Sequence, residues 1–139
     1  MIYLDTSALV AIYLPEAASD RAEAIVSAEL PCAISDLSEV EFYSAISRRL
    51  RMKELKRSDA LTVIDAFADD VKVQRFQLAH VETSHFRIAR SLIARFDTPL
   101  RSLDALHVAI ARDRGFQLLT LDKSLAKASR RLGLEVLTA

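Results

Sequence analysis

Four acidic residues of this chain have the types and positions that a metal-binding site needs. Short apolar runs lead straight into Asp5 and Asp122, and the stretch from Leu100 to Leu103 leads into Asp104. Glu41 lies near the start of a predicted long helix. Carboxylic acids ordinarily titrate near pH 4, so several carboxylates crowded together at neutral pH repel one another unless a cation offsets their charge. Mg²⁺ and Mn²⁺ prefer oxygen ligands and keep some of their waters. The four acids therefore predict a divalent metal site.

Hydroxyl side chains stand beside these acids, and each acid also has a purely structural explanation. Thr6, Ser7 and Thr120 could orient a ligand or a bound water, and Ser7 is also expected to cap a helix. An Asp or Glu at a helix start accepts backbone N–H bonds and opposes the helix dipole, which is worth about 0.3–2 kcal/mol. Capping explains each acid taken singly, so the metal site depends on their convergence.

Strand and helix signals alternate along the chain. Short apolar runs predict strands at residues 2–4, 32–34, 71–78, 116–121 and 134–137. Helical periodicity and caps predict helices at residues 7–15, 16–28, 58–70, 81–96, 102–114 and 123–132. They also predict a long helix that ends near residue 52, for which Ser35, Asp36 and Ser38 are all candidate caps. This alternation predicts an α/β fold with right-handed crossovers and a mainly parallel sheet. Ligands of such sheets lie beyond the carboxyl ends of the strands, where Asp5 and Asp122 are expected.

Size and composition narrow the class of protein. A chain of 139 residues, 51% of them hydrophobic, can bury the core of one domain. Lys and Arg balance Asp and Glu at 19 each, so nucleic acid or membrane would be attracted only by a local patch. The single cysteine, Cys32, is interpreted as a small core residue of a protein in a reducing compartment. With no membrane span or leader in the pattern, we expect a cytoplasmic protein.

Four segments together resemble a known family. They are Ile2-Tyr3-Leu4-Asp5-Thr6-Ser7-Ala8-Leu9, the region of Glu41, Ser102-Leu103-Asp104-Ala105-Leu106-His107-Val108-Ala109-Ile110-Ala111, and Leu119-Thr120-Leu121-Asp122. In order and spacing they are similar to the PIN-domain nucleases, over essentially the whole chain. The compact length looks most like the VapC-type toxin ribonucleases of toxin–antitoxin pairs.

The resemblance implies a fold, an activity and partners. It implies one PIN-like domain over residues 1–139, with three α/β/α layers around a mainly parallel sheet of four to five short strands. The implied activity is that of a divalent-metal-dependent endoribonuclease, which cleaves RNA through a metal-activated water. The matching acidic quartet for Mg²⁺ or Mn²⁺ is Asp5, Glu41, Asp104 and Asp122, with Thr6 and Thr120 as accessory hydroxyls. The implied partners are a second copy in a homodimer and an antitoxin that covers the acidic pocket.

Two assignments within this set stay open or are declined. Glu39 and Glu41 lie about 200° apart around a helix, so only one can face the pocket, and the spacing favours Glu41. Glu41 could instead complete a capping box with Ser38. His107 shares a helix face with Asp104, but it is assigned to packing because hard oxygen ligands do not need it.

Basic and apolar side chains predict contacts with partners. The densest basic stretch follows the predicted helix of Glu41, and Arg48, Arg49 and Arg51 are candidates for phosphate contacts with RNA. A solvated helix end that favours cations explains this stretch equally well. The apolar surface for the antitoxin or the dimer is expected on the early helices. Its candidate residues are Leu9, Ile12, Tyr13 and Leu14.

Other functions fit parts of the pattern. An aspartyl-phosphate phosphatase would use Asp5 as its nucleophile, but Ser7 stands where such enzymes carry a second Asp. A phosphoacceptor receiver domain suits the order of the acids poorly. A non-catalytic PIN-like module that binds protein or RNA would use the acids only as helix caps.

Overall fold

The computed structural model describes residues 1–139 as five strands and seven helices in alternation. The strands are β1 (Ile2–Leu4), β2 (Cys32–Ser35), β3 (Phe76–Ala79), β4 (Gln117–Leu119) and β5 (Val136–Leu137). They form one sheet in the order β3-β2-β1-β4-β5, and every neighbouring pair is parallel. The predicted parallel α/β sheet is therefore confirmed. The carboxyl ends of all five strands lie on one edge of it.

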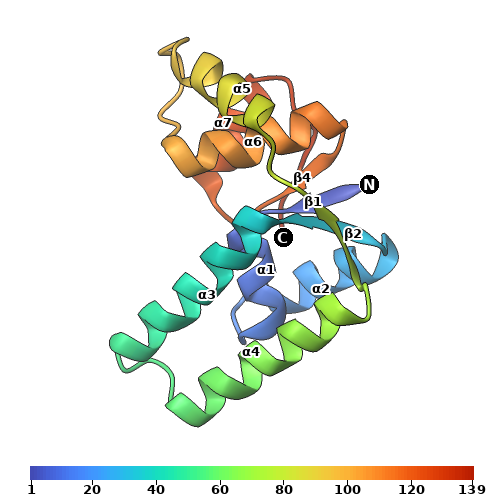
Figure 1. The fold of residues 1–139 in the computed structure, drawn as a ribbon, viewed down its shortest axis with the longest axis vertical. Coiled ribbons are helices and arrows are strands. Elements are labelled where there is room, and N and C mark those ends of the chain that lie inside the picture. The colour runs from blue at the N-terminus through green and yellow to red at the C-terminus, as the bar shows by residue number, and fades with distance from the viewer.

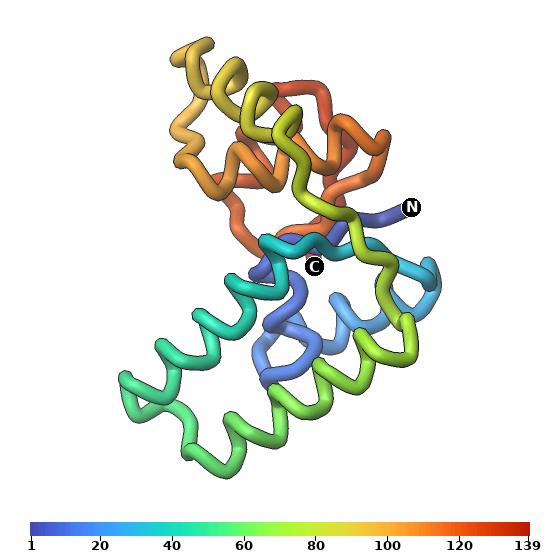
Figure 2. The backbone as a smooth tube through the Cα atoms, in the orientation of Figure 1, coloured from blue at the N-terminus to red at the C-terminus, as the bar shows by residue number.

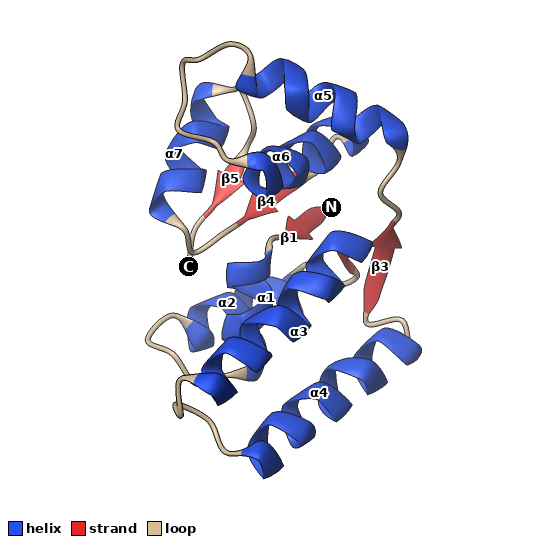
Figure 3. Cartoon of the chain, turned by 60° about the vertical axis from the view of Figure 1, so that its left-hand side comes forward, coloured by secondary structure: helices blue, strands red, loops and turns tan.

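Seven helices cover the two faces of the sheet and complete three layers (Figure 1). The helices are α1 (Thr6–Tyr13), α2 (Ser19–Ala28), α3 (Asp36–Arg51), α4 (Arg57–Lys72), α5 (Thr83–Ile93), α6 (Ser102–Arg114) and α7 (Lys123–Arg131). Helices α1 to α4 lie on one side and α5 to α7 on the other (Figure 3). The predicted three-layer α/β/α architecture is confirmed. Figure 2 shows α3 and α4 as a long hairpin that extends away from the sheet, and both chain ends at the sheet.

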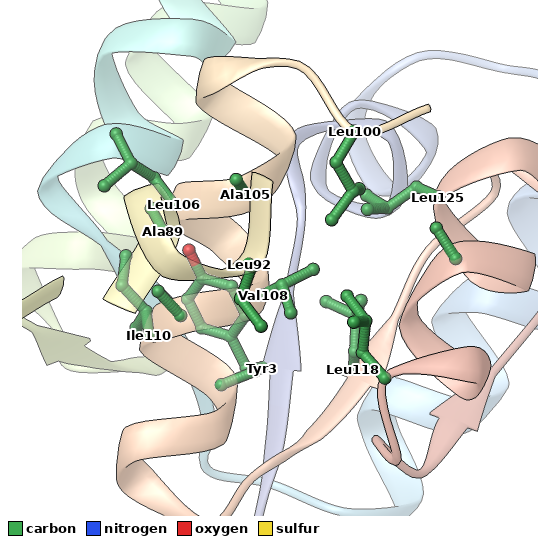
Figure 4. Close-up of a cluster of buried hydrophobic side chains, with 14 of the residues drawn as sticks. Tyr3, Ala89, Leu92, Leu100, Ala105, Leu106, Val108, Ile110, Leu118 and Leu125 are labelled. Atoms are coloured by element: carbon green, nitrogen blue, oxygen red, sulfur yellow. The ribbon is translucent and has the colours of Figure 1, made fainter. Parts of the chain in front are cut away.

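Two hydrophobic cores flank the sheet because strand residues alternate between its faces. Tyr3 packs into the core under α5, α6 and α7, whereas its neighbours Ile2 and Leu4 pack into the core under α1 to α4. Figure 4 shows the first of these cores, with Tyr3 close to Val108 and Ile110 of α6. The central strand is therefore buried on both faces, and the residue that follows it is held rigidly.

The third predicted strand is confirmed, but its predicted start is wrong. The sequence pattern predicts extended chain over residues 71–78, but α4 continues to Lys72, and the strand is Phe76–Ala79. Ile64, Phe67 and Val71 all contact the second core at helical spacing, so burial extends the helix. Gln74 then reverses the chain with a φ of 59°. No helix of the structure is both long and apolar enough to cross a membrane.

Candidate functional site

The four predicted acids line one cavity at the carboxyl ends of the two central strands. Its volume is about 340 Å³. The predicted site residues in its lining are Asp5, Thr6, Ser7, Glu41, Asp104 and Asp122. They come from the junction of β1 and α1, from α3, from α6 and from the loop between β4 and α7, which lie far apart in the sequence. The fold therefore produces the predicted convergence of carboxylates.

The carboxylates are nevertheless not gathered around a point. No three His, Cys, Asp or Glu side chains lie close enough together to hold a metal ion as the structure stands. Each acid is held instead by hydrogen bonds from the protein. The expectation that the fold alone brings the acids within coordinating reach of one ion is therefore not met.

Asp5 is the most deeply placed acid, with 3% of its surface exposed. It directly follows β1 and caps α1, because its Oδ1 accepts the N–H of Ala8 at 2.9 Å. Thr120 donates to Oδ2 at 2.6 Å and Ser7 to Oδ1 at 2.7 Å. Burial raises the pKa of Asp5 above its ordinary value, although the three hydrogen bonds act in the opposite direction. The folded protein therefore holds a carboxylate that favours protonation or a nearby cation.

The hydroxyls of Ser7 and Thr120 link Asp5, which follows β1, to the loop after β4. The prediction that Ser7 also caps a helix is wrong, because Asp5 takes that position. The Ser7 hydroxyl instead accepts the backbone N–H of Leu121 at 2.8 Å while it donates to Asp5. Thr120 accepts the N–H of Asp122 at 3.0 Å. These hydroxyls therefore set the orientation of Asp5 relative to Asp122.

Glu41 faces the cavity, and Glu39 does not line it. The capping box predicted for Ser38 and Glu41 is wrong. β2 continues to Ser35, so Ser35 caps α3 and forms the capping box with Ser38. Glu41 therefore takes no part in capping the helix.

The Glu41 carboxylate is held by Thr6 and His107. Its Oε2 accepts a hydrogen bond from the Thr6 hydroxyl and lies 2.7 Å from Nε2 of His107. Burial raises the pKa of Glu41, but the two hydrogen bonds, together with the electrostatic attraction of His107, outweigh burial, and the net pKa lies below its ordinary value. Glu41 is therefore ionised at neutral pH.

Asp104 and Asp122 serve both as helix caps and as cavity walls. Asp122 caps α7 through a 2.9 Å bond from the N–H of Leu125. Asp104 accepts the N–H of Arg101 at 3.4 Å in the first turn of α6. Each uses one carboxylate oxygen for its helix, and the other oxygen has no hydrogen bond within the protein. The two explanations of these acids, helix capping and a role in the site, are thus compatible.

The donor set fits a hard divalent cation in type and in charge. All four acids present oxygen ligands, and no lysine or arginine contacts Asp5 to neutralise it. Arg49 lines the cavity, but it pairs with Glu16 at 2.5 Å and with Glu54 at 3.7 Å. A cation would therefore compensate buried negative charge that the side chains leave uncompensated.

His107 is a site residue, and its assignment to packing from the sequence is incomplete. It has 3% of its surface exposed and connects Glu41 to the hydroxyl of Tyr3, which lies 2.6 Å from Nδ1. The three-residue spacing from Asp104 is a usable signal, because it places both side chains on one helix face. His85, by contrast, joins Glu82 to Asp113 away from the cavity.

Two of the three predicted RNA-binding arginines lie beside the acids. Arg48 and Arg49 line a groove of about 650 Å³ that also includes Thr6 and Glu41. Arg51 bonds instead to Ser47, one turn earlier on the helix, and does not line this groove.

The predicted apolar partner surface is wrong in two of its residues. Leu9 and Leu14 are buried in the second core, because the apolar face of α1 packs on the sheet. Tyr13 is partly buried and donates to Asp70. Apolar side chains on α3 and around the groove are exposed instead. These are Val40, Tyr43, Met52 and Leu103.

Comparisons with known proteins agree on one family. The family model of the PIN domain matches residues 2–131. The chain is 34% identical over 144 residues to ribonuclease VapC35 of Mycobacterium tuberculosis, covering 98% of this chain and 95% of that protein. The crystal structure of M. tuberculosis VapC20, described as a sarcin-ricin loop cleaving toxin, superposes with a TM-score of 0.72 at 20% identity, covering 92% and 95% of the two chains. VapBC2 of Rickettsia felis, solved with a DNA fragment from its promoter, gives 0.70 at 18% identity, covering 100% and 99%.

Proposed function

The chain belongs to the PIN domain family, and on that premise we propose that it is a divalent-metal-dependent endoribonuclease, the toxin of a VapBC-like toxin–antitoxin pair. The observation that carries the proposal is the convergence of four carboxylates on one cavity at the carboxyl edge of the sheet. The relative that is a ribonuclease by name aligns over almost the full length of this chain. Fold and site thus support the same activity.

In the proposed mechanism, Asp5, Glu41, Asp104 and Asp122 hold Mg²⁺ or Mn²⁺. When bound, the cation lowers the pKa of a water and neutralises charge on the phosphodiester. Thr120 and Ser7 hold Asp5, and Thr6 holds Glu41, so these hydroxyls orient the carboxylates. No side chain of the protein has to act as a nucleophile.

The groove beside the site suits an RNA strand. Arg48 is exposed and lines this groove next to Glu41, so its guanidinium can contact a phosphate near the acids. Arg49 reaches the same groove but is paired with two glutamates. We therefore assign the main phosphate contact to Arg48 and assign no phosphate contact to Arg51.

The proposed partners are an antitoxin and a second copy of the chain. One of the similar solved structures is VapBC2, a toxin–antitoxin complex. The exposed apolar residues Met52 and Leu103 line the groove beside the acids, and Val40 and Tyr43 are exposed on α3. Apolar surface beside an acidic pocket suits a protein segment that covers both.

RNA cleavage by purified protein tests the function. We expect degradation of mixed cellular RNA with Mg²⁺ or Mn²⁺, none with chelator, and none with Asp5→Asn, whose fold is checked by circular dichroism. Folded Asp5→Asn that cleaves like the wild type would refute the assignment, as would cleavage that persists in chelator. Phosphate trapped covalently on Asp5 would identify a phosphatase, and an inert wild type would identify a binding module.

A further inference from the structure

A buried chain of hydrogen bonds connects the sheet to Glu41. Tyr3 of β1 has no exposed surface, and its ring lies 5.7 Å from the ring of His107, centre to centre. The Tyr3 hydroxyl lies 2.8 Å from Oγ of Ser35 and 2.6 Å from Nδ1 of His107. His107 Nε2 lies 2.7 Å from Oε2 of Glu41. This series of hydrogen bonds thus joins β1, the end of β2, α6 and α3.

The donors and acceptors can be assigned so that every polar hydrogen of this network is used. Ser35 and Ser38 each accept the other's backbone N–H, and Ser38 also reaches the carbonyl of Leu4 at 3.3 Å. In this assignment the Ser35 hydroxyl donates to the Tyr3 oxygen at 2.8 Å, and the Tyr3 hydroxyl donates to Nδ1 of His107 at 2.6 Å. Nε2–H of His107 is left to donate to the Glu41 carboxylate. Every polar hydrogen of the chain is then used in one direction.

We propose that Tyr3 and His107 are positioning residues, which direct Nε2–H of His107 at Glu41 and thereby fix the Glu41 carboxylate toward the cavity. A carboxylate on a surface helix would otherwise rotate freely. Here one Glu41 oxygen is held by both His107 and Thr6. Groups that orient a metal ligand in this way control how well the ligand set binds. The inference rests on the proposed role of Glu41 as a metal ligand.

The apolar surroundings favour this arrangement. Tyr3 lies in the core under α6 with Val108 and Ile110, and its hydroxyl is the polar end of a side chain otherwise among carbon atoms (Figure 4). Burial raises the pKa of Tyr3 above its ordinary value, so the hydroxyl keeps its proton and remains a donor. A histidine that accepts this proton at Nδ1 has only Nε2 with which to donate.

Nuclear magnetic resonance on the metal-free protein tests the tautomer directly. With ¹⁵N-labelled histidine, long-range ¹H–¹⁵N correlations should show His107 as Nε2–H at neutral pH. His107→Gln identifies its signals among those of the three histidines. Tyr3→Phe, which removes one oxygen and keeps the ring, should mix the two tautomers of His107. The matched control is Tyr13→Phe, whose hydroxyl bonds to Asp70 and which should leave His107 unchanged.

Manganese binding, measured by calorimetry, tests the consequence for Glu41. We expect His107→Leu to weaken Mn²⁺ binding by about 10- to 100-fold, and His107→Gln, which keeps an N–H donor, to recover part of this loss. A His107 that carries no proton on Nε2 in the wild type would overturn the proposal. Wild-type Mn²⁺ binding by folded His107→Leu would do the same. If the wild type binds no Mn²⁺ while His107 is Nε2–H, the proposed metal-dependent function fails and the tautomer assignment stands.

Discussion

In the proposed function, Asp5 serves the metal site at the expense of stability. Its carboxylate is buried and receives three hydrogen bonds, but no positive side chain contacts it. Burial still raises its pKa, so the ionised form is less stable in the folded chain than in the unfolded chain. A site prepared for a cation carries this penalty when the cation is absent.

Asp5→Asn should separate activity from stability. Asparagine can still cap α1 through its carbonyl oxygen, and it carries no charge to bury. In chelator at neutral pH we expect the variant to be at least as stable as the wild type in urea denaturation. With Mn²⁺ we expect the variant to cleave RNA more than about 100-fold more slowly than the wild type. This loss is larger than the loss expected when a residue that only orients a metal ligand is removed.

The stability difference between wild type and Asp5→Asn should depend on pH. The folded pKa of Asp5 is raised, so the penalty of its charge is fully present above that pKa. The penalty disappears as the pH falls through the folded pKa to the unfolded value, for which 3.8 is the ordinary figure. The free energies of unfolding of the two proteins should therefore converge in acid. A difference that widens in acid would contradict this account of Asp5.

Cys32 should be inert to thiol reagents in the folded protein. The thiol has no exposed surface, and burial raises its pKa to about 11, so thiolate is scarce at neutral pH. We expect Ellman's reagent to titrate no thiol in native buffer and one after denaturation in guanidinium. Rapid reaction in native buffer would mean that β2 opens readily.

At the scale of elements, α6 carries Asp104 near its start and His107 one turn later. Its end depends on Gly115, which adopts the left-handed conformation with a φ of 66°. A Cβ atom built at Gly115 meets nothing within 4 Å, so only backbone conformation resists substitution there. The helix end can therefore be perturbed without disturbing its neighbours.

Gly115→Ala should lower the free energy of unfolding by about 1–2 kcal/mol, the cost of a left-handed alanine. Gly115→Asn should cost less, because asparagine tolerates this conformation. Both variants should keep full cleavage activity when folded, since Gly115 lies at the opposite end of α6 from Asp104. Equal stability of the alanine and asparagine variants would contradict the conformational explanation.

At the scale of the whole molecule, the charge is balanced and RNA binding must depend on the groove. The formal net charge is zero, and the groove beside the acids contains Arg48 and Arg49. Such a protein should bind RNA weakly and with a shallow dependence on salt, because few phosphates are neutralised.

Arg48→Gln should reduce both the affinity for single-stranded RNA and its salt dependence. Loss of one phosphate contact should lower the slope of log K against log salt by about 0.7. Binding is measured in chelator, so that no cleavage occurs. The matched control is Lys72→Gln, which removes a charge at the end of α4, away from the groove. An equal effect of both substitutions would show that net charge, and not the groove, governs binding.

Much of the fold follows from local patterns. Ile2 to Leu4 is apolar on both faces, and Gly115 is the residue type that ends a helix, so β1 and the end of α6 could be predicted from neighbouring residues alone. The alternation of strands and helices then implies a parallel sheet, which brings Asp5 and Asp122 to one edge. Class, order of elements and the acidic edge thus depend on short-range periodicity.

Only the tertiary structure decided which side chains meet. Ser35 caps α3 because β2 extends to that residue, and this register turns Glu41 into the cavity. Tyr3 and His107 are 104 positions apart, and their contact arises because α6 packs over β1. Hydrogen bonds between distant residues depend on the packing of whole elements to within an ångström, which periodicity does not encode. The carboxylates and the hydroxyls beside them were therefore predictable from the sequence, whereas the hydrogen bonds from Tyr3 through His107 to Glu41 were not.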